Sequence, residues 1–177
     1  MAKIGLRYPC YKGAVKKGVI AKAIQADIAI TMSNGKLYAD DVLIEDDASF
    51  QDGNITLNID DLSAEMQTEF LGHAKNATTE EITANVDDIS PFVGIGFYGV
   101  KIKAGVRAYR ALWFPKIKFA EPSDSLATKG QSLAFGTDSI VGAIYADDIG
   151  DWKKEQTFTT EAEAKTYIEG KAGIVGV

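Results

Sequence analysis

The chain has 177 residues, of which 46% are hydrophobic and 25% charged, and this composition excludes a disordered protein and fits one globular domain. Its net charge of −6 argues against a general nucleic-acid-binding protein, which would be basic. The single Cys10 excludes an intrachain disulfide, and no apolar run approaches the ~18 residues of a membrane span. The opening MAKIGLRYP lacks an apolar region, so we expect no signal peptide and folding in the cytoplasm.

The first third of the chain contains two segments without clear periodicity and one strand pattern. Residues 1–18 carry four spaced glycine and proline residues, which predicts an extended N-terminal arm outside the core. Residues 19–32 alternate as in a half-buried antiparallel strand, followed by an Asn34-Gly35 hairpin-turn signal. The apolar face of that strand is Ile20, Ile24, Ile28, Ile30 and Met32. Residues 40–53 are acidic, and we expect a long loop there.

A single main helix is predicted after a short strand over residues 54–59. Asp60 or Asp61 is expected to cap it, and an apolar stripe spaced by four runs from about Leu62 to Leu71. Gly72 has the position of a C-terminal cap. Alternation over residues 80–86 predicts another strand.

The segment over residues 92–119 predicts the β-hairpin around which the chain is organised. Residues 92–103 are apolar on both faces at their start, which is typical of a strand buried on both sides. Residues 103–105 form the turn and 106–119 the return strand, in which Pro115 marks a bulge or an edge.

The C-terminal part predicts two more strands and a short helix. The strands cover residues 131–146, interrupted near 136–138, and residues 152–159. Thr160 and Glu163 fit a capping box, so residues 160–177 are read as a helix over 161–169, ended by Gly170, and a tail. The whole chain 1–177 is therefore predicted to be one mainly β domain, an antiparallel sandwich or partly closed barrel with one main flanking helix.

Four segments resemble the major tail proteins of long, non-contractile-tailed phages, especially those of Gram-positive hosts. They are MAKIGLRYP, KLYADDVLIEDDASF, ITLNIDDLSAEM and GFYGVKIKAGVRAYRALWFPKIKFAEPSDSLATKG. The resemblance covers roughly residues 2–146 and is weakest in the C-terminal part. A phage or prophage copy of this siphovirus-type tail-tube protein is therefore expected.

This resemblance implies a structural virion protein of two packed sheets flanked by a helix. Such a protein is made in the cytoplasm of the bacterial host and stacks as rings, usually hexameric, into the tail tube that carries DNA from the capsid. Its partners would be further copies of itself and the tape-measure, tail-tip and tail-terminator proteins. DNA would pass without specific binding, and no membrane or cofactor would be involved.

Opposite charges in two segments suggest contacts between stacked rings. Residues 1–22 carry six basic residues and no acid, whereas residues 40–61 carry eight acids and no base. We therefore expect these segments to meet across rings, although a solvated face is the plainer explanation of any charge run. The candidate inter-ring residues are Lys12, Lys16, Lys17, Asp40, Asp41, Glu45, Asp46 and Asp47. The tube lumen is expected to be acidic or neutral, so that it repels phosphates.

Chemical sites are disfavoured by the residue inventory, and we expect no enzyme. Residues 94–99 match G-x-G-x-x-G, but the match lies inside a strand pattern with no following helix, so close backbone packing is the simpler explanation. His73, the only histidine, lacks a G-x-S-x-G partner motif, and one Cys with one His cannot build a usual zinc site. The acids of residues 45–53 do not have calcium-loop spacing.

Two other functions stay open. One is a tube protein of a contractile tail or of a related secretion system, which would share the fold. The other is a carbohydrate- or ligand-binding β module, which would need an exposed aromatic platform. A filled core under Trp113 and Trp152 would argue against that module.

Overall fold

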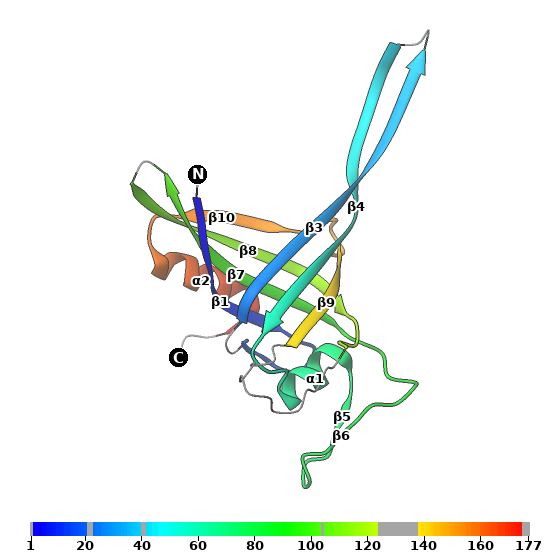
Figure 1. The fold of residues 1–177 in the computed structure, drawn as a ribbon, viewed down its shortest axis with the longest axis vertical. Helices are drawn as coiled ribbons and strands as arrows, with labels where there is room; N and C mark the ends of the chain where they lie inside the picture. The colour runs from blue at the N-terminus through cyan, green and yellow to red at the C-terminus, as the bar shows by residue number, and fades with distance from the viewer. Residues whose placement is uncertain (1, 21–22, 40–41, 104, 124–137, 175–177) are drawn as a thin grey trace, which may run out of the picture.

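The computed structural model of the protein describes residues 2–20, 23–39, 42–103, 105–123 and 138–174, and Figure 1 shows their arrangement. In chain order the elements are β1 (Ala2–Lys12), β2 (Lys17–Val19), β3 (Ala23–Ala39), β4 (Val42–Ile59), α1 (Ala64–Leu71), β5 (Ala74–Lys75), β6 (Ile82–Thr83), β7 (Phe92–Lys103), β8 (Val106–Phe119), β9 (Asp138–Tyr145), β10 (Lys154–Phe158) and α2 (Glu161–Ala172). The fold is mainly β, as predicted, and the strand pairs are antiparallel.

One large sheet provides most of the structure. Its strand order is β2-β1-β7-β8-β9-β4-β3, and β10 pairs with the first half of β8. Side chains from β4, β7, β8 and β9 meet in a single core, which gives the sheet the character of a sandwich. Its fully buried members include Ile55, Leu57, Val93, Ile95, Phe114, Ile117 and Ile140.

The helix α1 closes one end of this core. Phe70 is fully buried, stacks on Phe119 with ring centroids 4.8 Å apart, and meets the edge of Tyr11 at 5.3 Å. Gly72 ends the helix in the left-handed region (φ 82°), as predicted, and its N–H donates to the Thr68 carbonyl. The N-cap is Ser63 rather than Asp60 or Asp61, because its hydroxyl accepts from the Met66 N–H.

The helix α2 covers the other face of β7 and β8 (Figure 1). Its small or apolar residues Ala164, Ile168 and Ala172 are buried against Cys10, Tyr98, Ala111 and Trp113. The predicted capping box of Thr160 and Glu163 is confirmed. The helix is longer than predicted, because Gly170 lies inside it and the left-handed cap is Gly173.

Polar contacts also tie α2 to β1 and β7. The Tyr8 hydroxyl donates to Glu169 at 2.7 Å, and Glu161 accepts from Arg7 at 2.8 Å and from the Tyr98 hydroxyl at 2.9 Å. Burial, reinforced by the neighbouring carboxylates, raises the pKa of both tyrosines to about 12. These hydroxyls therefore remain donors over the whole physiological pH range.

The predicted organising hairpin is confirmed as β7 and β8, and it lies at the centre of the sheet. Residues 93–98 are buried on both faces, by the main core on one side and by α2 on the other. The predicted irregularity at Pro115 is also confirmed, because the register slips between Val93–Ile117 and Ile95–Phe114. This bulge lets Phe114 and Ile117 face the same core.

Three N-terminal predictions are wrong. Residues 2–12 are not an arm outside the core but β1, paired with β7 and burying Cys10 and Tyr11. Asn34-Gly35 is not a hairpin turn, since both residues pair with β4 inside β3. Residues 42–53 are not a loop but continue β4, so backbone pairing with β3 overrides their acidic composition.

Other predicted elements are shorter or lie outside the described residues. The strand expected over residues 80–86 is reduced to β6, which pairs with β5. The strand expected over 131–146 is β9 from Asp138 onward, and residues 124–137 lie outside the described part. Within the described residues, neither helix has the length and apolar character that crossing a membrane requires.

Candidate assembly surfaces

The free edge of β3 is the first candidate surface. Among the described residues, β3 is the last strand in the sheet order and pairs only with β4. The sequence predicted one buried apolar face for this strand, but Ile24, Ile28 and Met32 are 57%, 37% and 44% exposed. An edge strand has a neighbour on one side only, so its apolar side chains remain partly in water. Ile20, before the strand, is buried, and Ile30 packs against the core.

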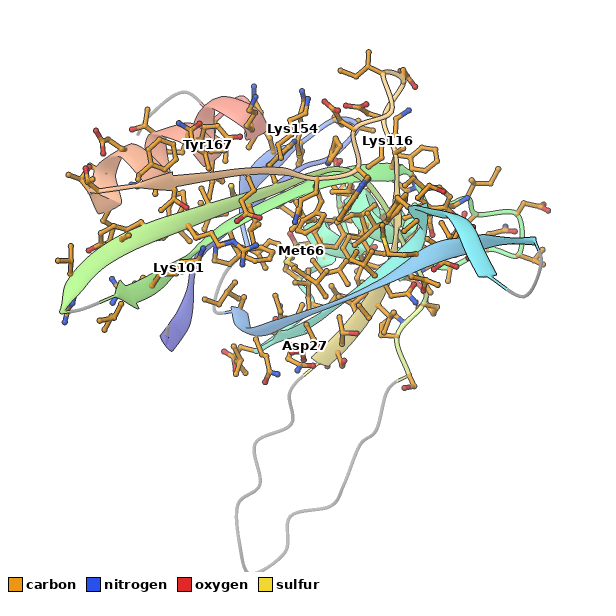
Figure 2. All side chains as sticks on the ribbon, turned by 90° about the horizontal axis from the view of Figure 1, so that it is seen from above. Asp27, Met66, Lys101, Lys116, Lys154 and Tyr167 are labelled. Atoms are coloured by element: carbon orange, nitrogen blue, oxygen red, sulfur yellow. The ribbon has the colours of Figure 1, made fainter. Side chains whose placement is uncertain are left out.

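A cleft of about 450 Å³ runs beside this edge, between β3 and the β1, β7 and β8 side of the sheet. Its apolar lining includes Leu6, Ile24, Ala26, Ile28, Phe97 and Leu112. Asp27 on β3 and Lys101 on β7 line the cleft as well, and Figure 2 labels both. The cleft thus combines apolar side chains with the free edge of β3 and with the charged side chains of Asp27 and Lys101.

Arg110 also lines the cleft, but its charge is neutralised within the chain. The guanidinium makes a bidentate contact with Glu155, in which Nη2 lies 2.6 Å from Oε2 and Nε contacts Oε1. Hydrogen bonds from Arg110, and then from Lys153, lower the pKa of Glu155 to about 2. Glu155 is consequently a carboxylate at any pH at which the protein would work.

The predicted basic residues lie around the tight connection between β1 and β2. Lys12 and Lys17 face each other across these strands and are exposed. Lys16 instead contacts Glu65 in the first turn of α1, with Nζ 2.8 Å from Oε1. The buried Glu69 accepts from the Val15 N–H at 3.2 Å, so the connection is anchored on α1. Sequence reasoning missed both glutamates, because no local pattern relates them to residues about 50 positions away.

The predicted acidic residues lie at the other end of the molecule. Glu45, Asp46 and Asp47 belong to the first part of β4, where the backbone pairs with Leu37, Lys36 and Gly35 of β3. Asp40 and Asp41 lie outside the described residues. The β3–β4 hairpin projects away from α1, on which the basic connection is anchored (Figure 1). The basic residues and this acidic stretch of β4 are therefore not brought together in one chain.

An exposed aromatic pair at one end of β7 and β9 is a surface feature that sequence reasoning did not find. Phe92 and Tyr145 meet edge to face at 5.4 Å and are 50% and 44% exposed. Lys116 Nζ lies 5.7 Å above the Phe92 ring and also contacts Asp148 at 2.5 Å. Lys116 of β8 pairs with Tyr145 of β9 in the sheet, and this pairing brings together side chains that are distant in the sequence.

The G-x-G-x-x-G match serves packing, as predicted. A Cβ atom at Gly94 would lie 2.6 Å from Trp113 Cζ2, and one at Gly96 would lie 2.5 Å from Trp113 Cε3. The absence of a side chain at the two glycines thus leaves the space that the buried Trp113 indole occupies. Among the described residues, no three His, Cys, Asp or Glu side chains are grouped as metal ligands.

Comparisons with known proteins add one similar structure. No family model and no curated protein matches the chain, so they do not confirm the tail-tube family. One similar solved structure is the cap that terminates the tube of the anti-feeding prophage, determined by cryo-electron microscopy. The match covers 89% of this chain and 93% of that chain, at 14% identity and a TM-score of 0.48. At this identity and TM-score, the likeness by itself assigns no function.

Proposed function

We propose that this protein is a structural subunit of a phage or prophage tail, which self-assembles into stacked rings forming a non-contractile tail tube. The observation that carries the proposal is the free β3 edge, where unpaired backbone and the exposed side chains of Ile24, Ile28 and Met32 border an apolar cleft. A second copy that adds a strand there would cover all three features at once. The sequence resemblance to major tail proteins supports the same function.

The shape of the chain supports stacking as well as ring formation. The described part of β4 beyond β9 runs from Val42 to Gly53 and pairs only with β3, which makes it a two-stranded ribbon. At ~3.3 Å per residue, its length is on the order of 40 Å. In a stack of rings, the acidic end of this ribbon can reach the basic β1–β2 connection of a neighbouring copy.

The finer features of the proposal follow from the tube function. Rings would be hexameric, and the tape-measure, tail-tip and tail-terminator proteins would be partners. DNA would pass through a lumen that is neutral or acidic. The role is structural rather than catalytic.

Assembly is tested by electron microscopy of the concentrated protein together with its mass from light scattering. We expect rings or hollow tubes. A Lys12→Glu/Lys17→Glu variant should lose stacking, and Lys16 is left unchanged because it already pairs with Glu65. Adding Glu45→Lys, Asp46→Lys and Asp47→Lys to that variant should restore stacking by exchanging the charges. Arg107→Glu/Lys171→Glu, which alters two other exposed cations, is the control.

Each part of the proposal can fail separately. Normal tubes from Lys12→Glu/Lys17→Glu would overturn the stacking contact while leaving the tube function standing. A monomer at every concentration that binds oligosaccharides would favour the ligand-binding module. Against that module, Trp113 is buried, and Trp152 stacks on Phe50 with ring centroids 4.6 Å apart, so neither ring is free as a platform.

A further inference from the structure

His73 lies between two carboxylates in a nearly closed environment. Its side chain is only 8% exposed, although the residue directly follows the glycine cap of α1. Nδ1 is 3.0 Å from Asp88 Oδ2, and Nε2 is 3.0 Å from Glu121 Oε2. A neutral imidazole carries one N–H, so only the imidazolium can donate both hydrogen bonds. The geometry therefore fits the protonated form of this histidine.

The two carboxylates belong to segments far apart in the sequence. Asp88 lies in the loop before β7, where its Oδ2 also accepts from the Asn85 N–H at 2.8 Å. Glu121 directly follows β8 and its neighbour Ala120, whose N–H donates to the Val141 carbonyl of β9. The imidazole thus joins α1, the 85–91 loop and the chain leaving the central sheet.

The two carboxylates differ in how firmly they are held without His73. The Asp88 side chain is 21% exposed and keeps its backbone donor, whereas the Glu121 side chain is 65% exposed. Water can therefore replace the imidazole for Glu121 at little cost, while Asp88 stays in its turn.

We propose that His73 is a pH-operated clasp, which in its protonated form fastens the chain after β8 to the end of α1 and on losing its proton releases Glu121. This device is independent of the tube function. It predicts a single local opening, at Glu121, rather than general unfolding.

The charged groups around the ring support this direction. Asp88 from the loop and Glu121 from the β8 side both favour the imidazolium, and the hydrogen bond to Asp88 is the largest influence raising the pKa of His73, against the opposing effect of burial. Two other charged groups of the neighbouring elements have partners of their own. Glu69 of α1 accepts a hydrogen bond from the Val15 N–H, and Lys75 of β5 contacts Glu80 at 3.4 Å. No described cation therefore opposes the protonated ring at contact distance.

The sign of the pH dependence follows from the raised pKa. A group whose pKa is higher in the folded chain stabilises the fold fully below its unfolded value of about 6.5, and this contribution is lost as pH rises through the folded value. The clasp is accordingly closed in mildly acidic solution and opens towards alkaline pH.

The test uses the fact that His73 is the only histidine of the full chain. Its ring Hε1 resonance can be titrated by NMR without assignment, and we expect a pKa above the ordinary value. Glu121→Gln should lower this pKa, whereas Glu81→Gln, an exposed glutamate of the neighbouring β5–β6 region, should not. A pKa at or below ~6.5, or an unchanged pKa in Glu121→Gln, would overturn the clasp.

Hydrogen exchange distinguishes the clasp from a histidine that merely fills space. Protection factors of residues 119–123, corrected for intrinsic rates, should be lower above the pKa found for His73 in the NMR titration than in mildly acidic solution below it, because the ring loses its proton as pH rises through that pKa. In Glu121→Gln, this protection should already be low at the acidic pH. Equal protection at both pH values in the unaltered chain would show that Glu121 is not released.

Discussion

The indole of Trp113 lies directly over the backbone of Gly96, with no room for a Cβ atom between them. Such an atom would be 2.5 Å from Trp113 Cε3 and 2.9 Å from Ile168 Cγ2. This contact lets α2 approach the β7–β8 hairpin, because a larger residue would push the indole into the helix. One missing side chain in the sheet therefore sets the distance between the sheet and its covering helix.

Gly96→Ala should destabilise the protein by about 1–3 kcal/mol, since overpacking a closed site forces neighbours from their preferred positions. Chemical denaturation measures this loss. Gly170→Ala is the matched control, because Gly170 lies on the exposed side of α2, where an added methyl group would meet nothing within 4 Å. It should stabilise the helix by about 0.5–1 kcal/mol. Equal stability of Gly96→Ala and the unaltered protein would contradict the packing argument.

Two contacts to the same carboxylate should differ in energetic value. Tyr98→Phe removes the buried hydroxyl that donates to Glu161 and should cost about 1 kcal/mol in the free energy of unfolding. Arg7→Met removes the exposed ion pair with Glu161, whose side chains are 52% and 41% accessible, and should cost clearly less. A larger loss from Arg7→Met would show that the ion pair, not the tyrosine, holds α2.

Glu155→Gln should lower stability by about 1 kcal/mol at neutral pH, because it removes a charge-assisted bidentate contact in a partly exposed place. The pKa of Glu155 is lowered to about 2 from 4.5. The stabilising contribution is therefore present above about 4.5 and is lost as pH falls towards 2. The difference in unfolding free energy between the two proteins should shrink in that window, and a constant difference would refute the assignment.

Ile24→Lys should separate folding from assembly. Ile24 is 57% exposed on the free β3 edge, so the folded monomer should change by no more than about 0.5 kcal/mol. A charge on an edge opposes the addition of another strand, and rings or tubes should be lost. Val86→Lys, at a side chain 96% exposed in the loop before β7, is the control for added charge. Assembly of Ile24→Lys at the normal concentration would mean that this edge is not an interface.

The sequence predicts those elements whose signals are local. The β7–β8 hairpin, the Gly72 cap and the Thr160–Glu163 capping box all depend on residues a few positions apart, and each is confirmed. The fold class follows from the number of alternating segments. Pro115 marks a bulge for the same local reason, since it has no N–H for the ladder.

The failures share a different cause, which is pairing between distant segments. Glycine and proline made residues 2–12 look irregular, yet β7 supplies a partner for β1 with bulges at residues 4–6 and 7–10. Asn34-Gly35 has the composition of a turn but lies within a paired strand. The cleft, the Lys16–Glu65 pair and the surroundings of His73 likewise join positions that no sequence period relates.

The contact between Tyr8 and Glu169 has a consequence for the order in which the chain can fold. These residues are 161 positions apart in the sequence. In addition, most of β1 pairs with β7, which is synthesised about 90 residues later. A ribosome-bound chain can form the β3–β4 hairpin early, whereas the first strand, which pairs with β2 only from Cys10 to Lys12, remains otherwise unpaired until β7 has been made. We expect slow folding that is completed after release, with the last helix closing over the first strand.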